Sequence, residues 1–91
     1  MPRWTHKLKK WTTDMLDLPQ DAIFDLPRIT MIGNMQIYVE NHRGVIFFSD
    51  DVLQLALSKG GLEIRGKQLS IRAILTEEVF VEGLIEQIRY I

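Results

Sequence analysis

With 91 residues, no cysteine and a net charge of −1, the sequence fits one small domain whose stability must come from packing rather than from disulfides. The composition excludes thiolate metal sites and cysteine nucleophiles, and no apolar run approaches the roughly 20 residues needed to cross a bilayer. Because the N-terminus also lacks the apolar stretch and cleavage site of a signal peptide, we expect a cytosolic protein.

The first eighteen residues predict a basic amphipathic helix. Apolar residues recur there at spacings of four and three, which places them on one helical stripe. The stripe consists of Trp4, Leu8, Trp11, Met15 and Leu18. Four basic residues precede residue 14, whereas the rest of the chain holds seven basic and twelve acidic residues, so the start carries +4 and the remainder −5.

Two functions suit this helix, and the sequence leaves both open. Tryptophan beside basic residues is typical of a helix that lies on an anionic membrane. The candidate membrane- or partner-binding residues are Arg3, Trp4, Lys7, Leu8, Lys10, Trp11 and Met15. The same stripe could instead dock on the body of the protein. Nucleic acid is disfavoured, because the body is acidic and no nucleic-acid-binding motif is evident.

Residues 19–28 predict a rigid elbow between the helix and the body. The tripeptide Asp-Leu-Pro occurs twice, at residues 17–19 and 25–27. Leucine before proline is pushed toward extended geometry, so Pro19 should end the first helix and Pro27 the short turn that follows it. Asp17 and Asp25 can accept backbone N–H groups as capping or turn residues.

From residue 29 to residue 91 the sequence predicts a mainly β domain. Four units read as strand, turn and second strand, with a period of about 16 to 17 residues. The glycines assigned to turns are Gly33, Gly44, Gly66 and Gly83, and Ser49 stands where one unit lacks its glycine. Such units can stack as a β-solenoid or fold as an antiparallel meander.

The fourth unit has two features of its own. At Gly83 the alternation of apolar and polar residues continues, which favours a bulge in one long bent strand. If the body is a solenoid, the last rung, residues 79–91, has no following cap, and its apolar edge would invite a second copy of the chain.

Few residues suggest catalysis or metal binding. His42 stands near Glu40 and could act as a general base, but Asn41 and Gly44 also suit a polar connection in which His42 is solvated or bonded to the backbone. The two histidines of the chain lack the spacing of metal ligands, and no phosphate-binding glycine motif is present. We therefore expect no enzyme, no metal site and no cofactor.

An ordered series of short motifs runs through nearly the whole chain. It comprises LDLP at 16–19, DLPRITMIG at 25–33, QIYVENHRG at 36–44 and an ending at 81–90 with a glycine and a terminal aromatic residue. The series resembles the YabP/YqfC family of sporulation proteins, and its YqfC members most closely. The resemblance implies a role in endospore formation, in the cytoplasm of the mother cell, and a membrane-embedded sporulation protein as a partner.

Together these patterns favour a non-enzymatic interaction module, with neither a nucleic acid nor a small molecule as its ligand. We expect it to be recruited to the outer forespore membrane, or to a protein in that membrane, and to self-assemble through exposed β edges. The alternatives are a hydrolase acting on the spore envelope and a small nucleic-acid-binding regulator. A cleft with convergent titratable groups would favour the hydrolase.

Overall fold

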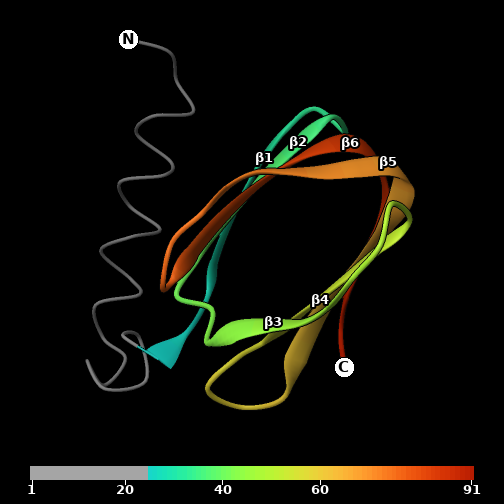
Figure 1. The fold of residues 1–91 in the computed structure, drawn as a ribbon. Coiled ribbons are helices and arrows are strands. Elements are labelled where there is room, and N and C mark those ends of the chain that lie inside the picture. The colour runs from blue at the N-terminus through green and yellow to red at the C-terminus, as the bar shows by residue number, and fades with distance from the viewer. Residues whose placement is uncertain (1–24) are drawn as a thin grey trace, which may run out of the picture.

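The computed structural model describes residues 25–91, which form one antiparallel sheet of six strands (Figure 1). The strands are β1 (Arg28–Ile32), β2 (Gln36–Glu40), β3 (Gly44–Phe48), β4 (Val52–Ala56), β5 (Gly61–Ile74) and β6 (Glu78–Tyr90). This confirms a mainly β protein over the described residues. The predicted helix over residues 1–18 and the elbow residues 19–24 lie outside them.

The strands pair in the order β1-β2-β6-β5-β4-β3, and every neighbouring pair is antiparallel. This excludes a parallel solenoid stack for the described residues. The first two predicted units are hairpins, β1–β2 and β3–β4. Gly33, with a φ of 54°, opens a three-residue loop between the paired residues Ile32 and Gln36.

The third and fourth units are not hairpins. The two strands predicted in each run together, giving β5 with 14 residues and β6 with 13. The register between β5 and β6 shifts between Arg65 and Gly66 and again between Lys67 and Ser70, where the two strands bend together. As the alternation predicts, β6 continues through Gly83 as one bent strand, with a φ of 142° at that residue.

The bend folds the sheet into two layers. Residues 61–65 of β5 pair with β4, whereas residues 78–82 of β6 pair with β2. One layer therefore holds β1, β2 and the neighbouring halves of β5 and β6, and the other holds β3, β4 and the remaining halves. Figure 1 shows the two long strands curving from one layer to the other.

The core lies between the two layers. Each strand directs alternate residues inward, and on β2 these are Ile37 and Val39, both fully buried. The rest of the buried apolar core is Leu53, Leu55, Leu57, Leu62, Ile64, Leu69, Val79, Val81 and Ile85. Fully burying one such side chain contributes about 1.5–3 kcal/mol, so the layers are held together mainly by this apolar contact.

One expectation about the edges is wrong. Residues 79–91 would have formed an uncapped edge in a solenoid, but β6 lies in the middle of the sheet between β2 and β5. Among the six described strands, the free edges are β1 and β3 instead. Within residues 25–91, no helix is long and apolar enough to span a bilayer.

Candidate interaction surface

Strand β3 exposes four consecutive apolar side chains at a free edge of the sheet. Its exposed residues, called the edge patch below, are Val45, Ile46, Phe47 and Phe48, with exposed fractions of 39–58%. Among the strands of residues 25–91 it pairs only with β4, so the N–H and C=O groups on its other side have no partner in a described strand. Natural edge strands are commonly protected by charged residues or proline. The sequence of β3, GVIFF, contains neither.

A bulge distributes the edge patch over both faces of the sheet. Val45 stands opposite the core residue Leu55, whereas Phe47 stands opposite the polar Gln54. The register shifts between Val45 and Phe47, and Phe48 returns to the inner face. A strand added beside β3 would therefore meet apolar side chains above and below its backbone. Peptide recognition by β-strand addition needs this combination of unpaired backbone groups and side-chain contacts.

The other free edge, β1, is less apolar. It also exposes Met31 and Ile32, but it begins with Arg28, which stands opposite Glu40 of β2. Arg28 was assigned to the elbow by the sequence, and in the structure it is the first residue of the strand. Of the two edges, β3 therefore has the stronger features of a protein-binding edge.

The chain enters the described body beside the start of β3. Ser58 Oγ donates a hydrogen bond of 2.9 Å to the carbonyl oxygen of Asp25, and Asn41 Nδ2 donates one of the same length to that of Leu26. The Asp25 carboxylate lies 3.8 Å from the guanidinium of Arg43, which immediately precedes β3. Pro27 then leads directly into β1. The segment before residue 25 thus joins the body at the corner where β3 begins.

His42 is a buried part of the same corner. Its side chain is 1% exposed, and its Nδ1 accepts a hydrogen bond of 3.0 Å from the backbone N–H of Gly44. Its Nε2 is also buried and has no hydrogen-bond partner among the described residues. The expected bond to the backbone is therefore present, whereas solvation of the ring is not. The ring of His42 is therefore enclosed in this structure.

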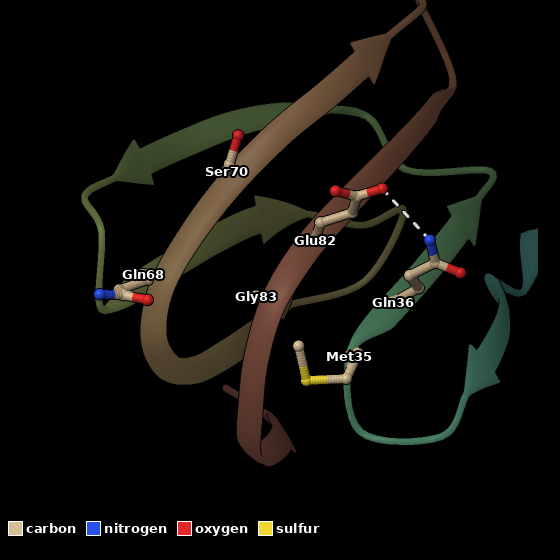
Figure 2. Close-up of a pocket in the computed structure, with 6 residues that line it drawn as sticks. All are labelled: Met35, Gln36, Gln68, Ser70, Glu82 and Gly83. Atoms are coloured by element: carbon tan, nitrogen blue, oxygen red, sulfur yellow. Dashed lines mark hydrogen bonds between the residues drawn. The ribbon is translucent and has the colours of Figure 1, made fainter.

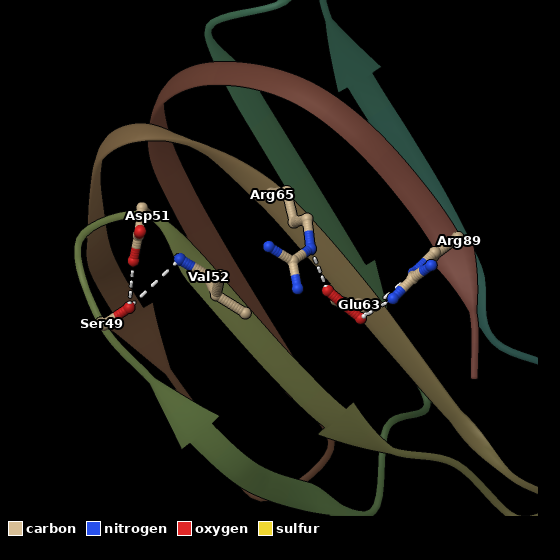
Figure 3. Close-up of polar contacts among 6 residues, drawn as sticks. All are labelled: Ser49, Asp51, Val52, Glu63, Arg65 and Arg89. Atoms are coloured by element: carbon tan, nitrogen blue, oxygen red, sulfur yellow. Dashed lines mark hydrogen bonds and ion pairs between the residues drawn. The ribbon is translucent and has the colours of Figure 1, made fainter.

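A second buried polar group, Glu63, was missed by the sequence analysis. Although it lies on the outer face of β5, it is only 2% exposed, because Arg65 and Arg89 cover it (Figure 3). Arg89 donates hydrogen bonds of 3.0 and 3.2 Å to one carboxylate oxygen, and Arg65 pairs with the other. Burial opposes ionisation of Glu63, but the hydrogen bonds from the two arginines outweigh it and lower its pKa.

Figure 3 also shows the polar turn that follows the edge patch. Ser49 Oγ donates a 2.6 Å hydrogen bond to the Asp51 carboxylate and accepts one of 3.3 Å from the backbone N–H of Val52. The turn predicted at Ser49 is thereby stabilised without a glycine. It also places two exposed acidic residues, Asp50 and Asp51, at the far end of β3.

An open cavity in the described part of the chain lies at the bend of β6 and has a volume of about 330 Å³. It is lined by Met35, Gln36, Gln68, Ser70, Glu82 and Gly83 (Figure 2). Its one ionisable side chain, Glu82, accepts a 3.2 Å hydrogen bond from Gln36 and lies 3.5 Å from the guanidinium of Arg72. Residues 25–91 also contain no group of three or more potential metal ligands.

The predicted site residues fall into two groups. The binding residues Arg3, Trp4, Lys7, Leu8, Lys10, Trp11 and Met15, together with Asp17 and Pro19, lie outside the described residues. Of the turn residues, Gly33 lies in the β1–β2 loop and Gly44 is the first residue of β3, while Gly66 and Gly83 lie at the bend. The edge patch was not among the predicted site residues.

Comparison with known proteins agrees with the motif series. The family model described as YabP family matches residues 25–91, which is the whole described body. The chain is also 46% identical over 86 residues to a Bacillus subtilis (strain 168) protein named "Uncharacterized protein YqfC", and the match covers 94% of this chain and 92% of that protein. The chain therefore belongs to the YabP family.

Proposed function

We propose that this protein is a non-enzymatic interaction module that acts in the mother cell during spore formation. The observation that carries the proposal is the edge patch, an uncharged strand that is apolar on both faces and is left unpaired along one side by the other strands of residues 25–91. The sporulation setting is supported by the motif series that resembles YabP and YqfC. The basic, tryptophan-bearing stripe of residues 1–18 supports recruitment to the outer forespore membrane or to a protein in it.

In this function β3 accepts an additional strand. The partner's backbone would bond to the free N–H and C=O groups of β3, and its alternate side chains would pack on the inner and outer apolar residues of the edge patch. The strand comes from a membrane-embedded sporulation protein or from a second copy of this chain, which would give self-assembly. Both partners bury the same surface, so one substitution weakens both.

The chain offers a matched pair of variants for testing this function. Ile46 of the edge patch and Ile74 at the end of β5 are 58% and 51% exposed, and Ile74 lies in the other layer near the turn to β6. Tagged wild type, Ile46→Lys and Ile74→Lys are used as baits in sporulating cells that also express an untagged copy. We expect Ile46→Lys alone to lose the membrane partner and the untagged copy. Equal recovery by all three baits would contradict a role for β3.

The hydrolase alternative has no supporting feature in residues 25–91. His42 is enclosed, and the cavity at the bend of β6 is lined by a single ionisable group. A hydrolytic site needs several such groups converging on one position. The interaction function is therefore the one that the described geometry supports.

A further inference from the structure

We propose that residues 1–18 of the same chain dock on the edge patch and cover it until a partner or a membrane takes its place. The first support is the exposed apolar surface of the edge patch, which is unfavourable in water. Four consecutive apolar side chains, each more than a third exposed, lie along the free edge of the described sheet and are divided between its two faces. Such surfaces mark binding sites or aggregation hazards rather than ordinary solvent-exposed surface.

The second support is the position at which the N-terminal segment joins the body, close to the start of β3. The main chain at Asp25 is held beside Ser58, and its carboxylate beside Arg43, one residue before β3. Residues 19–24 can extend to about 20 Å, and a five-residue strand is about 17 Å long. The connection can therefore bring residues 1–18 to any point along β3. A helix of eighteen residues would be about 27 Å long, enough to cover the whole strand.

The third support is complementarity. Residues 1–18 carry an apolar stripe with two tryptophans, which matches the apolar character of the edge patch. They begin with a charge of +4, and acidic side chains lie at both ends of β3. Exposed Asp50 and Asp51 follow the strand. Before it, Asp25 and Glu77 are both paired with Arg43, so two negative charges and one positive charge leave that end with a net charge of −1. Opposite charges arranged around an apolar centre are typical of a specific protein contact.

The fourth support concerns competition with a second copy. A tethered segment with a short connection has an effective concentration on the order of millimolar at its site. A second copy of the chain at micromolar concentration is at least about a hundredfold more dilute. The chain's own segment should therefore occupy the edge patch in the isolated protein. One consequence rests on the function proposed above: moving the segment to a membrane would uncover β3 where its partner is found.

Tryptophan fluorescence tests the docking directly, because both tryptophans of the chain, Trp4 and Trp11, lie in the proposed segment. The full-length wild type is measured without lipid, at a concentration where sedimentation shows a monomer. We expect short-wavelength emission and protection from acrylamide. Ile46→Lys should shift the emission to longer wavelength and increase quenching, whereas Ile74→Lys should leave both unchanged. Circular dichroism confirms that each variant keeps its sheet.

A second measurement uses the absence of native cysteine. Leu8→Cys combined with Ile46→Cys should form an intramolecular disulfide under mild oxidation, detected by mass spectrometry. Leu8→Cys combined with Ile74→Cys should form much less. Comparable yields for the two pairs, or disulfides only between chains, would overturn the docking.

A third measurement compares the burial of the tryptophans with and without lipid vesicles. Tryptophans that are exposed in the free protein and become buried only on addition of phosphatidylserine vesicles would also overturn the docking. That result would leave the proposed function intact, because partner capture through β3 is measured separately in cells. Conversely, equal capture by the Ile46→Lys and Ile74→Lys baits would remove the proposed function without affecting the fluorescence result.

Discussion

The contact between the two long strands at their bend makes a demanding test of the fold. Gly66 of β5 lies directly against β6, and a Cβ built on it would be 1.9 Å from the carbonyl oxygen of Leu84 and 2.9 Å from the carbonyl carbon. The preferred separation of two such atoms is about 3.5 Å. Both opposing atoms belong to the backbone, so no change of rotamer relieves the overlap. Gly66→Ala must therefore push β5 and β6 apart.

The expected loss of stability can be worked from this overlap. Inserting a methyl group into a packed interior usually costs about 1–3 kcal/mol, and a backbone clash belongs at the upper end. Strand separation also strains the hydrogen bond of 3.0 Å from the Gly66 N–H to the carbonyl oxygen of Asp51, which contributes about 1 kcal/mol. The sum is about 3–4 kcal/mol. For a domain of this size each kcal/mol lowers the melting temperature by about 4–8 °C, so a decrease of at least about 12 °C is expected.

The assay is thermal unfolding followed by circular dichroism, with Gly33→Ala as the matched control. At Gly33 an added Cβ meets no atom within 4 Å, and only the left-handed φ of 54° opposes it. That backbone penalty is about 1–2 kcal/mol, so Gly33→Ala should melt well above Gly66→Ala. If the two variants melted within a few degrees of each other, the close approach of β5 and β6 at the bend would be refuted.

Three further substitutions test the buried groups. Leu55→Ala removes a fully buried core side chain and should cost about 2–5 kcal/mol in urea unfolding; a loss below about 1 kcal/mol would contradict the two-layer core. His42→Ala should destabilise the protein by about 2 kcal/mol, because it leaves a cavity and removes the acceptor for the Gly44 N–H. The exposed control Lys59→Ala should change stability by less than about 0.5 kcal/mol. Equal effects of the two substitutions would argue against burial of His42. Because the pKa of Glu63 is lowered in the folded state, its contribution is complete at neutral pH and is lost as pH falls below its ordinary value of 4.5 toward the lowered one. Glu63→Gln should therefore melt lower than wild type at pH 7, with the difference shrinking below pH 4; a pH-independent difference would disprove the assigned role of the carboxylate.

Local strand positions were predictable from the sequence, and their pairing was not. Period-two alternation and glycine located the strands, because both reflect the local backbone and one buried face. The same pattern in Val79–Glu82 suits an edge strand or a central one. The position of β6 beside β2 depends on pairs such as Gln36 with Glu82 and Glu40 with Glu78, which lie 46 and 38 positions apart and which periodicity does not encode.

The candidate site, too, depends on strand pairing that could not be predicted from the sequence. The uninterrupted run GVIFF is typical of a strand buried on both faces, yet β3 is a free edge, because no other described strand pairs beyond it. Glu63 alternates with Leu62 and Ile64, which predicts a solvent-exposed side chain. The feature of the sequence that could have indicated a paired and buried Glu63 is Arg65, which lies two residues further along the same face of β5. Arg89, the second arginine that covers Glu63, comes from a distant strand and was not foreseeable.

The sharing of β5 and β6 between both layers also bears on how the molecule loses its structure. Each long strand supplies hydrogen-bonding partners on either side of the bend, so neither layer has a complete set of strands of its own. When one half of β5 and β6 loses its strand pairing, the other half loses packing and hydrogen-bonding partners. Residues 28–90 should accordingly behave as a single cooperative unit, without a stable half-folded intermediate in which one layer survives alone.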